Sequence, residues 1–196
     1  MAQTNALDVM ISRTSPKDFD EPAPSHEALS RALEAAVAAP DHARLRPWRF
    51  ILIEGAARHA FGQVLADALK CRNADVSAPE LEREAAKAMR APLIVVVAAR
   101  LIERPGVPEI EQMLAAGAAA QNLMLGLHAQ GFGAVWKTGA PAYDPRVKAA
   151  LGLEPGDAIV GFIYAGTPRP RAVVPPRPAS EEFISRWSGA PAGISS

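Results

Sequence analysis

The sequence of 196 residues contains one cysteine, Cys71, and no excess of either charge. Its 21 Lys and Arg residues balance 21 Asp and Glu residues, so nothing favours nucleic acid or an anionic membrane surface as a partner. A single cysteine excludes an intramolecular disulfide and every cysteine-rich metal site, and it fits a reducing cytosol. We therefore expect a cytoplasmic protein.

Long apolar runs are missing as well. The least polar stretch, 113–127, still contains Gln121 and Asn122 and is too short to span a bilayer. The first residues show no basic region followed by an apolar one, so we expect neither a membrane segment nor a secretory signal.

Several catalytic motifs are also absent. The sequence has no Walker-type loop, no His-Glu-x-x-His pair and no Gly-x-Ser-x-Gly elbow. Gly131 and Gly133 fail the dinucleotide fingerprint, because they precede a predicted strand and Trp136 stands at the third glycine position. The four histidines lack metal-ligand spacing, so we expect no metal site.

Predicted strands and helices alternate along the chain. Helices are predicted over 5–13, 25–39, 56–70, 78–89, 110–130 and 144–151. Strands are predicted over 49–54, 93–99, 132–136 and 159–165. This interleaving favours one domain, 1–196, with a sheet covered by helices on both faces.

Three segments carry more specific expectations. The uninterrupted apolar run 93–99 is typical of a central strand that is buried on both faces. The charged segment 78–89 is expected to be a solvated cover rather than core. Gly131 is expected to end the preceding helix, because glycine tolerates the left-handed conformation that such a position requires.

The chain after Gly166 is rich in proline and arginine, which predicts an extended arm lying on another surface. Small residues over 115–120 permit close helix contact with the sheet or with a second copy. An exchanged arm is a low-cost route to a dimer, so we favour a homodimer in which 168–196 packs on the partner subunit.

The segment from Gly131 to Gly139 is the most informative one. Trp136, Lys137 and Thr138 place an aromatic ring, a cation and a hydroxyl at the exit of a predicted strand, where sheets commonly bind ligands. We expect a flat aromatic wall beside a cation, which suits a planar, anionic ligand such as a flavin nucleotide. Taken singly, Trp136 would more often belong to the core and Lys137 to the surface.

Two further motifs contain groups that suit a ligand. Arg13, Thr14 and Ser15 combine a guanidinium with hydroxyls, which matches a phosphate monoester. The alternative is that Arg13 only caps a helix C-terminus. His42 follows Ala-Pro-Asp in a sharp turn, and such a histidine is also often a structural hydrogen bonder.

Taken together, these motifs resemble the flavin-dependent nitroreductase family, and most of all its small single-domain members. The resemblance rests on the order and spacing of Arg13-Thr14-Ser15, Ala39-Pro40-Asp41-His42, Trp136-Lys137-Thr138 and the strand 161–168. It implies an α+β fold, an α/β/α sandwich with a central mixed sheet. It also implies FMN as cofactor, in a groove between two subunits.

The resemblance further implies roles for seven residues. Arg13, Thr14 and Ser15 would hold the FMN phosphate and ribityl chain, with Thr14 standing where relatives have a second arginine. His42 is expected near the flavin. Trp136, Lys137 and Thr138 match the family's Trp-Arg-Ser, and Lys137 is expected at the N1 and C2=O edge of the flavin.

The implied activity is transfer of hydride from NAD(P)H through FMN to a nitroaromatic, a quinone or a similar small acceptor, with ping-pong kinetics. No catalytic side chain is then needed. Two alternatives stay open: a non-catalytic flavin-binding carrier or sensor, and a flavin-free dimeric scaffold.

Overall fold

The computed structural model describes residues 5–169, 176–187 and 189 of the chain. Its strands are β1 (Phe19–Asp20), β2 (Trp48–Glu54), β3 (Leu93–Ala99), β4 (Gly133–Lys137) and β5 (Ala158–Pro168). Its α-helices are α1 (Ala6–Ser12), α2 (His26–Val37), α3 (Ala57–Arg72), α4 (Ala78–Ala85), α5 (Glu109–Ala129) and α6 (Pro145–Ala150). Short 3-10 helices cover His42–Arg44 (η1), Ala86–Met89 (η2), Ala140–Tyr143 (η3) and Ser180–Phe183 (η4).

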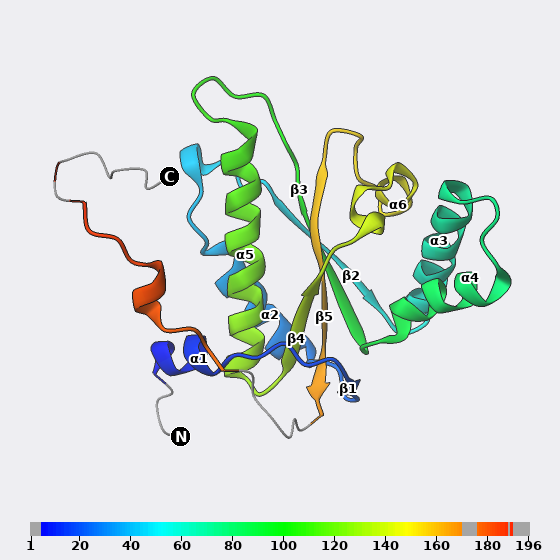
Figure 1. Ribbon diagram of the computed structural model, residues 1–196, viewed down its shortest axis with the longest axis horizontal. Helices are drawn as coiled ribbons and strands as arrows, with labels where there is room; N and C mark the ends of the chain where they lie inside the picture. Colours follow the sequence, from blue (N-terminus) through cyan, green and yellow to red (C-terminus); the bar gives the residue numbers. More distant parts are fainter. Residues whose placement is uncertain (1–4, 170–175, 188, 190–196) are drawn as a thin grey trace, which may run out of the picture.

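The sheet is built around β5 (Figure 1). β3 pairs with one edge of β5 and with β2 beyond it, while β4 and β1 both pair with β5. All pairings between the described strands are antiparallel. The α/β/α sandwich is thus confirmed. The sheet was expected to be mixed, but the described strands form no parallel pair.

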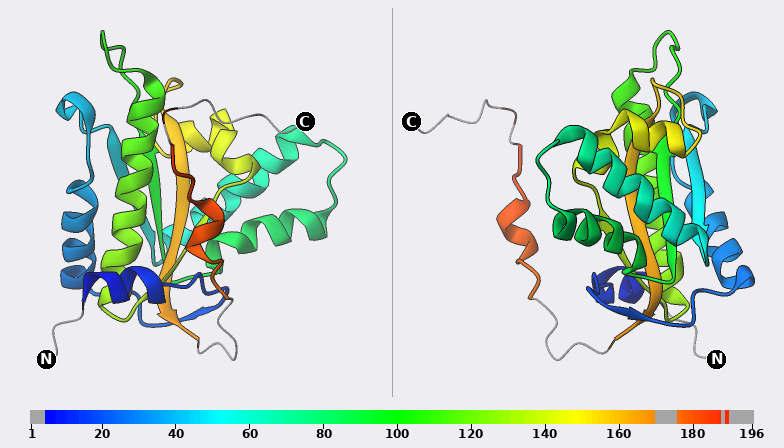
Figure 2. Two further views of the ribbon diagram at one scale, coloured as in Figure 1. Left: turned by 60° about the vertical axis from the view of Figure 1, so that its left-hand side comes forward. Right: turned by 90° about the vertical axis from the view of Figure 1, so that its right-hand side faces the viewer.

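Helices cover both faces of the sheet, as expected (Figures 1 and 2). α2 and α5 pack on one face over a core that includes Val95 and Ile163. α3 and α6 pack on the other face, over a core that includes Val96 and Phe162. All seven residues of β3 are fully buried, which confirms the prediction of a strand enclosed on both faces.

The predicted helix boundaries follow local chemistry. Asn5 and Ser25 cap α1 and α2, since their side chains accept backbone N–H groups of the first turn. Gly131 follows the end of α5 with a φ of 86°, a left-handed conformation that glycine adopts without strain. The fixed turn sends the chain directly into β4.

The arm begins after β5. Arg177 donates a hydrogen bond to the carbonyl oxygen of Arg13, and η4 is set apart from the sheet (Figure 2). Phe183, Ile184 and Trp187 are 73%, 63% and 85% exposed. The rest of the predicted arm, at 170–175, 188 and 190–196, lies outside the described residues. No helix in the described ranges is both long and apolar enough to cross a bilayer.

Candidate functional site

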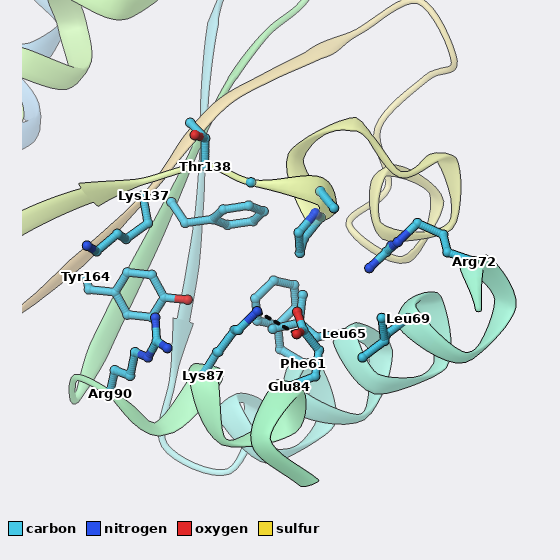
Figure 3. A pocket seen from close by; sticks show the side chains of 14 residues that line it. Phe61, Leu65, Leu69, Arg72, Glu84, Lys87, Arg90, Lys137, Thr138 and Tyr164 are labelled. Atoms are coloured by element: carbon cyan, nitrogen blue, oxygen red, sulfur yellow. Dashed lines mark hydrogen bonds and ion pairs between the residues drawn. The ribbon is translucent and has the colours of Figure 1, made fainter. Parts of the chain in front are cut away.

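A cavity of about 420 Å³ opens where β4 ends (Figure 3). Lys137 is the last residue of β4, and Thr138 and Gly139 lead from it into η3. Gly139 has a φ of 90°, so the chain turns sharply there. The lining side chains come from α3, α4, η2, β5 and the β4 exit. They are those of Phe61, Leu65, Leu69, Arg72, Glu84, Lys87, Arg90, Lys137, Thr138, Ala140, Pro141, Phe162 and Tyr164.

The floor of the cavity is aromatic and aliphatic. The rings of Phe61 and Phe162 lie 5.9 Å apart at an angle of 45°. Both are buried, as is Leu65 of α3, while Tyr164 presents its hydroxyl beside Arg90 (Figure 3). This combination of flat apolar surface with polar groups at the rim is typical of a site for a planar organic molecule.

Cations dominate the polar part of the lining. Lys87 pairs with Glu84 at 2.5 Å, and Arg72 pairs with Asp144. Burial opposes ionisation of Asp144, but a hydrogen bond from the Arg146 N–H and the Arg72 guanidinium outweigh it and lower its pKa. Lys137 and Arg90 enter no ion pair within the described ranges, so the lining favours an anionic ligand.

A second hollow of about 210 Å³ adjoins the cavity and shares Arg90, Lys137 and Tyr164 with it. Lys17 adds a third cation to this hollow. Burial raises the pKa of the Tyr164 phenol. The positive charge of Arg90 lowers it by less, and the negative charge of Glu84 raises it further. The phenol therefore stays protonated and can donate a hydrogen bond.

The predicted phosphate-binding residues follow α1 and lead directly to Lys17. One Arg13 nitrogen donates to the Thr14 carbonyl oxygen at 2.9 Å and to the Ser15 hydroxyl at 3.1 Å. Burial, and after it the charge of Arg177, lowers the pKa of Arg13. The guanidinium is thus held in one orientation in a positively charged neighbourhood, which favours an anion.

His128 extends this neighbourhood. Its Nε2 and the Ser12 hydroxyl are hydrogen-bonded at 2.9 Å. Burial, followed by the charge of Arg13, lowers the pKa of His128. The imidazole is therefore neutral at pH 7 and adds a polar contact rather than a charge.

The predicted aromatic wall is not formed by Trp136. Side chains alternate along a strand, so Trp136 and Lys137 lie on opposite faces of the sheet. The Trp136 ring packs on the α5 side and donates to the Val160 carbonyl oxygen at 3.2 Å. The wall beside the cation consists of Phe162 and Tyr164 instead, and Trp136 can reach the cavity only through its main chain.

His42 lies far from the cavity of its own chain. Its Nδ1 is 2.5 Å from Glu111 in the first turn of α5, whereas Arg13 neighbours His128 in the last turn. Seventeen residues of helix separate the two ends, or about 25 Å. One chain therefore does not bring Arg13 and His42 together.

The loop that carries His42 has an unusual backbone. Ala43, Arg44 and Arg46 have φ values of 57°, 56° and 50°, a region that costs energy for residues other than glycine. The Asp41 carboxylate accepts the Arg46 N–H at 2.6 Å, which helps to hold this conformation.

Of the lining residues, only Lys137 and Thr138 were predicted from the sequence. The charged and hydroxyl-bearing ones that it missed are Lys17, Arg72, Glu84, Lys87, Arg90 and Tyr164. The segment 78–89 was expected to be solvated cover, and this is wrong for Glu84, which is only 8% exposed and lines the cavity. The segment divides into α4 and η2, and Lys87 of η2 lines the cavity as well. The one signal in the sequence was the excess of basic residues between Lys87 and Arg90.

Comparisons with known proteins identify the family of the chain. A family model described as "Nitroreductase family" matches residues 10–167. The chain is 40% identical to "Putative NAD(P)H nitroreductase YdjA" of Escherichia coli K12, over 86% of this chain and 91% of that protein. It is 34% identical to a "Putative NAD(P)H nitroreductase" of Haemophilus influenzae, over 83% of this chain and 88% of that protein.

Solved structures share the fold. A nitroreductase-like family protein from Bacillus cereus superposes with a TM-score of 0.83 at 24% identity, over 96% of this chain and 99% of that one. A "putative nitroreductase in complex with fmn" from Desulfovibrio desulfuricans superposes with a TM-score of 0.70 at 25% identity, over 94% of this chain and 98% of that one.

Proposed function

The chain belongs to the nitroreductase family, and from that premise we propose that it is an FMN-dependent oxidoreductase. It takes hydride from NAD(P)H and passes it to a nitroaromatic, a quinone or a similar small acceptor. The observation that carries this proposal is the cationic, aromatic-floored cavity at the exit of β4. Its adjoining hollow is lined by Lys17, which follows Arg13, Thr14 and Ser15 closely in the chain.

The residues of this cavity fit FMN. The two adjoining hollows, of about 420 and 210 Å³, match an elongated ligand with a flat ring system. Phe162 and Tyr164 supply flat surface, and Lys17, Arg90 and Lys137 supply positive charge. The D. desulfuricans relative, at 25% identity, was solved with FMN, which supports the same cofactor here.

We assign the phosphate and ribityl chain to Arg13, Thr14 and Ser15. The Arg13 guanidinium is held by its own Thr14 carbonyl oxygen and the Ser15 hydroxyl, so little conformational entropy is lost when an anion binds. The Thr14 hydroxyl adds a donor where relatives have a second arginine. Trp136, Lys137 and Thr138 contact the ring system, with Trp136 acting through its main chain.

When bound, FMN would supply the redox chemistry, the transfer of hydride from NAD(P)H to the second substrate. The chain's residues bind and orient the reactants. Lys137 would place a positive charge near the ring system, and the protonated Tyr164 would offer a hydrogen bond from the floor. If the floor covers one face of the bound ring, both substrates would have to use the other face in turn, which predicts ping-pong kinetics.

The protein is proposed to act as a homodimer with FMN at the interface. In its first turns α5 exposes Ile110 and Leu114, which are 59% and 65% exposed. At the other end of α5, α1 exposes Leu7, Met10 and Ile11. Exposed apolar surface of this extent is typical of an interface. A second copy would also bring His42 to the cavity and give the arm, 168–196, a surface to cover.

The test is an absorption spectrum of the purified protein with and without added FMN, followed by anaerobic addition of NADH or NADPH. We expect flavin bands that bleach with one or both nucleotides and return when a quinone or nitroarene is added. Bands that no nucleotide bleaches would favour a carrier or sensor. A protein that binds no flavin would favour a dimeric scaffold.

A further inference from the structure

Four arginines gather where β2 begins and β3 ends. Arg44 and Arg46 lie in the loop that leads into β2, and Arg49 is the second residue of that strand. Arg100 follows β3, and its N–H donates to the Pro47 carbonyl oxygen at 2.8 Å, which joins the two segments. Arg44, Arg46 and Arg100 are exposed. We call these four residues the arginine patch.

The positive charge of the arginine patch is not neutralised. None of its members enters an ion pair with a residue that the structure describes. Glu111 is engaged by His42 instead, and the one carboxylate in the loop, that of Asp41, accepts the Arg46 N–H. The patch thus keeps an excess of positive charge, although the formal charge of the whole chain is zero. Several guanidinium forks in one place suit a phosphate group.

The loop that carries two of these arginines is held in a strained conformation. Ala43, Arg44 and Arg46 all have positive φ values between 50° and 57°, and strain of this kind concentrates at ligand sites. One nitrogen of Arg49 donates to the carbonyl oxygens of Arg46 and Trp48, at 3.0 and 2.7 Å. The backbone under the patch is therefore braced, so less conformational entropy is lost when an anion binds.

NADPH carries a group that matches the arginine patch. It differs from NADH only by a phosphate on the 2′-oxygen of its adenosine ribose, and arginine is suited to that group. In the proposed dimer, the loop that brings His42 to the cavity of the second copy also brings Arg44 and Arg46 to its rim. We propose that the patch binds the 2′-phosphate of NADPH and makes NADPH the preferred hydride donor. This inference rests on the proposed function, since it selects the reductant for the same site.

The test measures kcat/KM for NADPH and for NADH with the flavin-loaded protein and a quinone as acceptor. We expect the wild type to favour NADPH by about tenfold or more, because hydrogen bonds between charged groups are strong. A double variant, Arg44→Gln with Arg46→Gln, removes two charges and should lower only the value for NADPH, so that the ratio falls toward one. Arg44→Lys with Arg46→Lys keeps the charges without the forks and should retain part of the preference.

A binding measurement supplies a readout that needs no turnover. Adenosine 2′,5′-bisphosphate contains the 2′-phosphate of NADPH, whereas adenosine 5′-phosphate lacks it. In calorimetric titrations the wild type should bind the bisphosphate about tenfold more tightly or better. The double glutamine variant should bind the two nucleotides with similar affinity.

Arg31→Gln serves as the matched control, because Arg31 is an exposed arginine of α2 outside the patch; its ratio should equal that of the wild type. Equal kcat/KM values for NADPH and NADH in the wild type would overturn the proposal, as would an unchanged ratio in the double glutamine variant. The wild-type comparison decides even if a variant fails to fold. If neither nucleotide reduces the flavin, the proposed function fails, and the calorimetric comparison alone then decides whether the patch binds a 2′-phosphate.

Discussion

At the scale of single residues, neighbours in β4 serve different parts of the molecule. Trp136 closes the core on the α5 side, and Lys137 enters the cavity on the other. The β-strand alternation separates the two side chains, although they are adjacent in sequence. Residues that look like one motif in the sequence are thereby divided between the core and the cavity.

Lys137 should contribute directly to flavin retention. A hydrogen bond to a charged group contributes roughly 1.5–3 kcal/mol, so we expect Lys137→Met to raise the dissociation constant for FMN about tenfold or more. It should also lower the flavin reduction potential. Lys70→Met, on the exposed side of α3, is the control. Unchanged affinity and potential in Lys137→Met would remove Lys137 from this role.

The Trp136 ring leaves no room for a side chain at position 161, so we expect Gly161 to be required for stability. A Cβ at this position would lie 2.0 Å from the indole nitrogen, so the ring has to move. We expect Gly161→Ala to lower the free energy of unfolding by about 1–3 kcal/mol or more, as overpacked cores do. Gly156→Ala, where a Cβ meets nothing within 4 Å, is the control in denaturant titrations. Equal stabilities of the two variants would contradict this packing.

At the scale of elements, α3 fixes the cavity wall from two sides. Gly62 lets α4 approach closely, because a Cβ there would be 2.6 Å from the Ala85 carbonyl oxygen. At the other end of α3, Arg72 pairs with Asp144, the N-cap of α6. The wall is therefore tied to both neighbouring helices and holds Glu84 and Lys87 in place.

The Arg72–Asp144 pair should make stability depend on pH in a defined direction. The pKa of Asp144 is lower in the folded chain than its ordinary value of 3.8. The ionised carboxylate therefore makes its full contribution to the free energy of unfolding above pH 3.8, and this contribution is lost as the pH falls through the folded-state pKa. Asp144→Asn keeps a capping side chain but loses the charge. We expect it to unfold about 1–3 kcal/mol more easily at pH 7.

This difference from the wild type should shrink below about pH 4, as the native carboxylate takes up its proton. Denaturant titrations between pH 3 and pH 7 measure it. Asp75→Asn, at an exposed position outside the ion pairs, should differ from the wild type by the same small amount at every pH. A constant difference for Asp144→Asn would show that the pair contributes no charge-dependent stability.

At the scale of the whole molecule, the sequence predicted those elements and helix ends that follow from hydrophobic periodicity and from capping residues. It located β3, the end of α5 at Gly131 and the caps Asn5 and Ser25. It did not predict that the segment 78–89 divides into α4 and η2, because both pack against α3 and local periodicity does not show such packing. Nor could it show that Trp136 and Lys137 lie on opposite faces until the strand register was known.

The exposed apolar residues in the first turns of α5 should hold two chains together. Leu114→Glu places a charge beside the exposed Ile110 on α5, so we expect a monomer in sedimentation experiments at concentrations where the wild type is a dimer. Flavin should be lost together with the dimer. Leu52→Glu, on the edge strand β2, changes the same residue type at a 42% exposed position and should leave the dimer intact. A dimeric Leu114→Glu would place the interface elsewhere.

The placement of Arg13 and His42 at opposite ends of α5 has a genetic consequence. If each flavin takes Arg13 from one chain and His42 from the other, Arg13→Ala and His42→Ala chains are each inactive as pure dimers. A hybrid dimer, however, concentrates both defects in one site and leaves the other whole. Equal mixing by unfolding and reassociation should restore about a quarter of the wild-type sites. Two defective alleles in one cell would then complement each other, whereas chains with self-contained sites would stay inactive in any mixture.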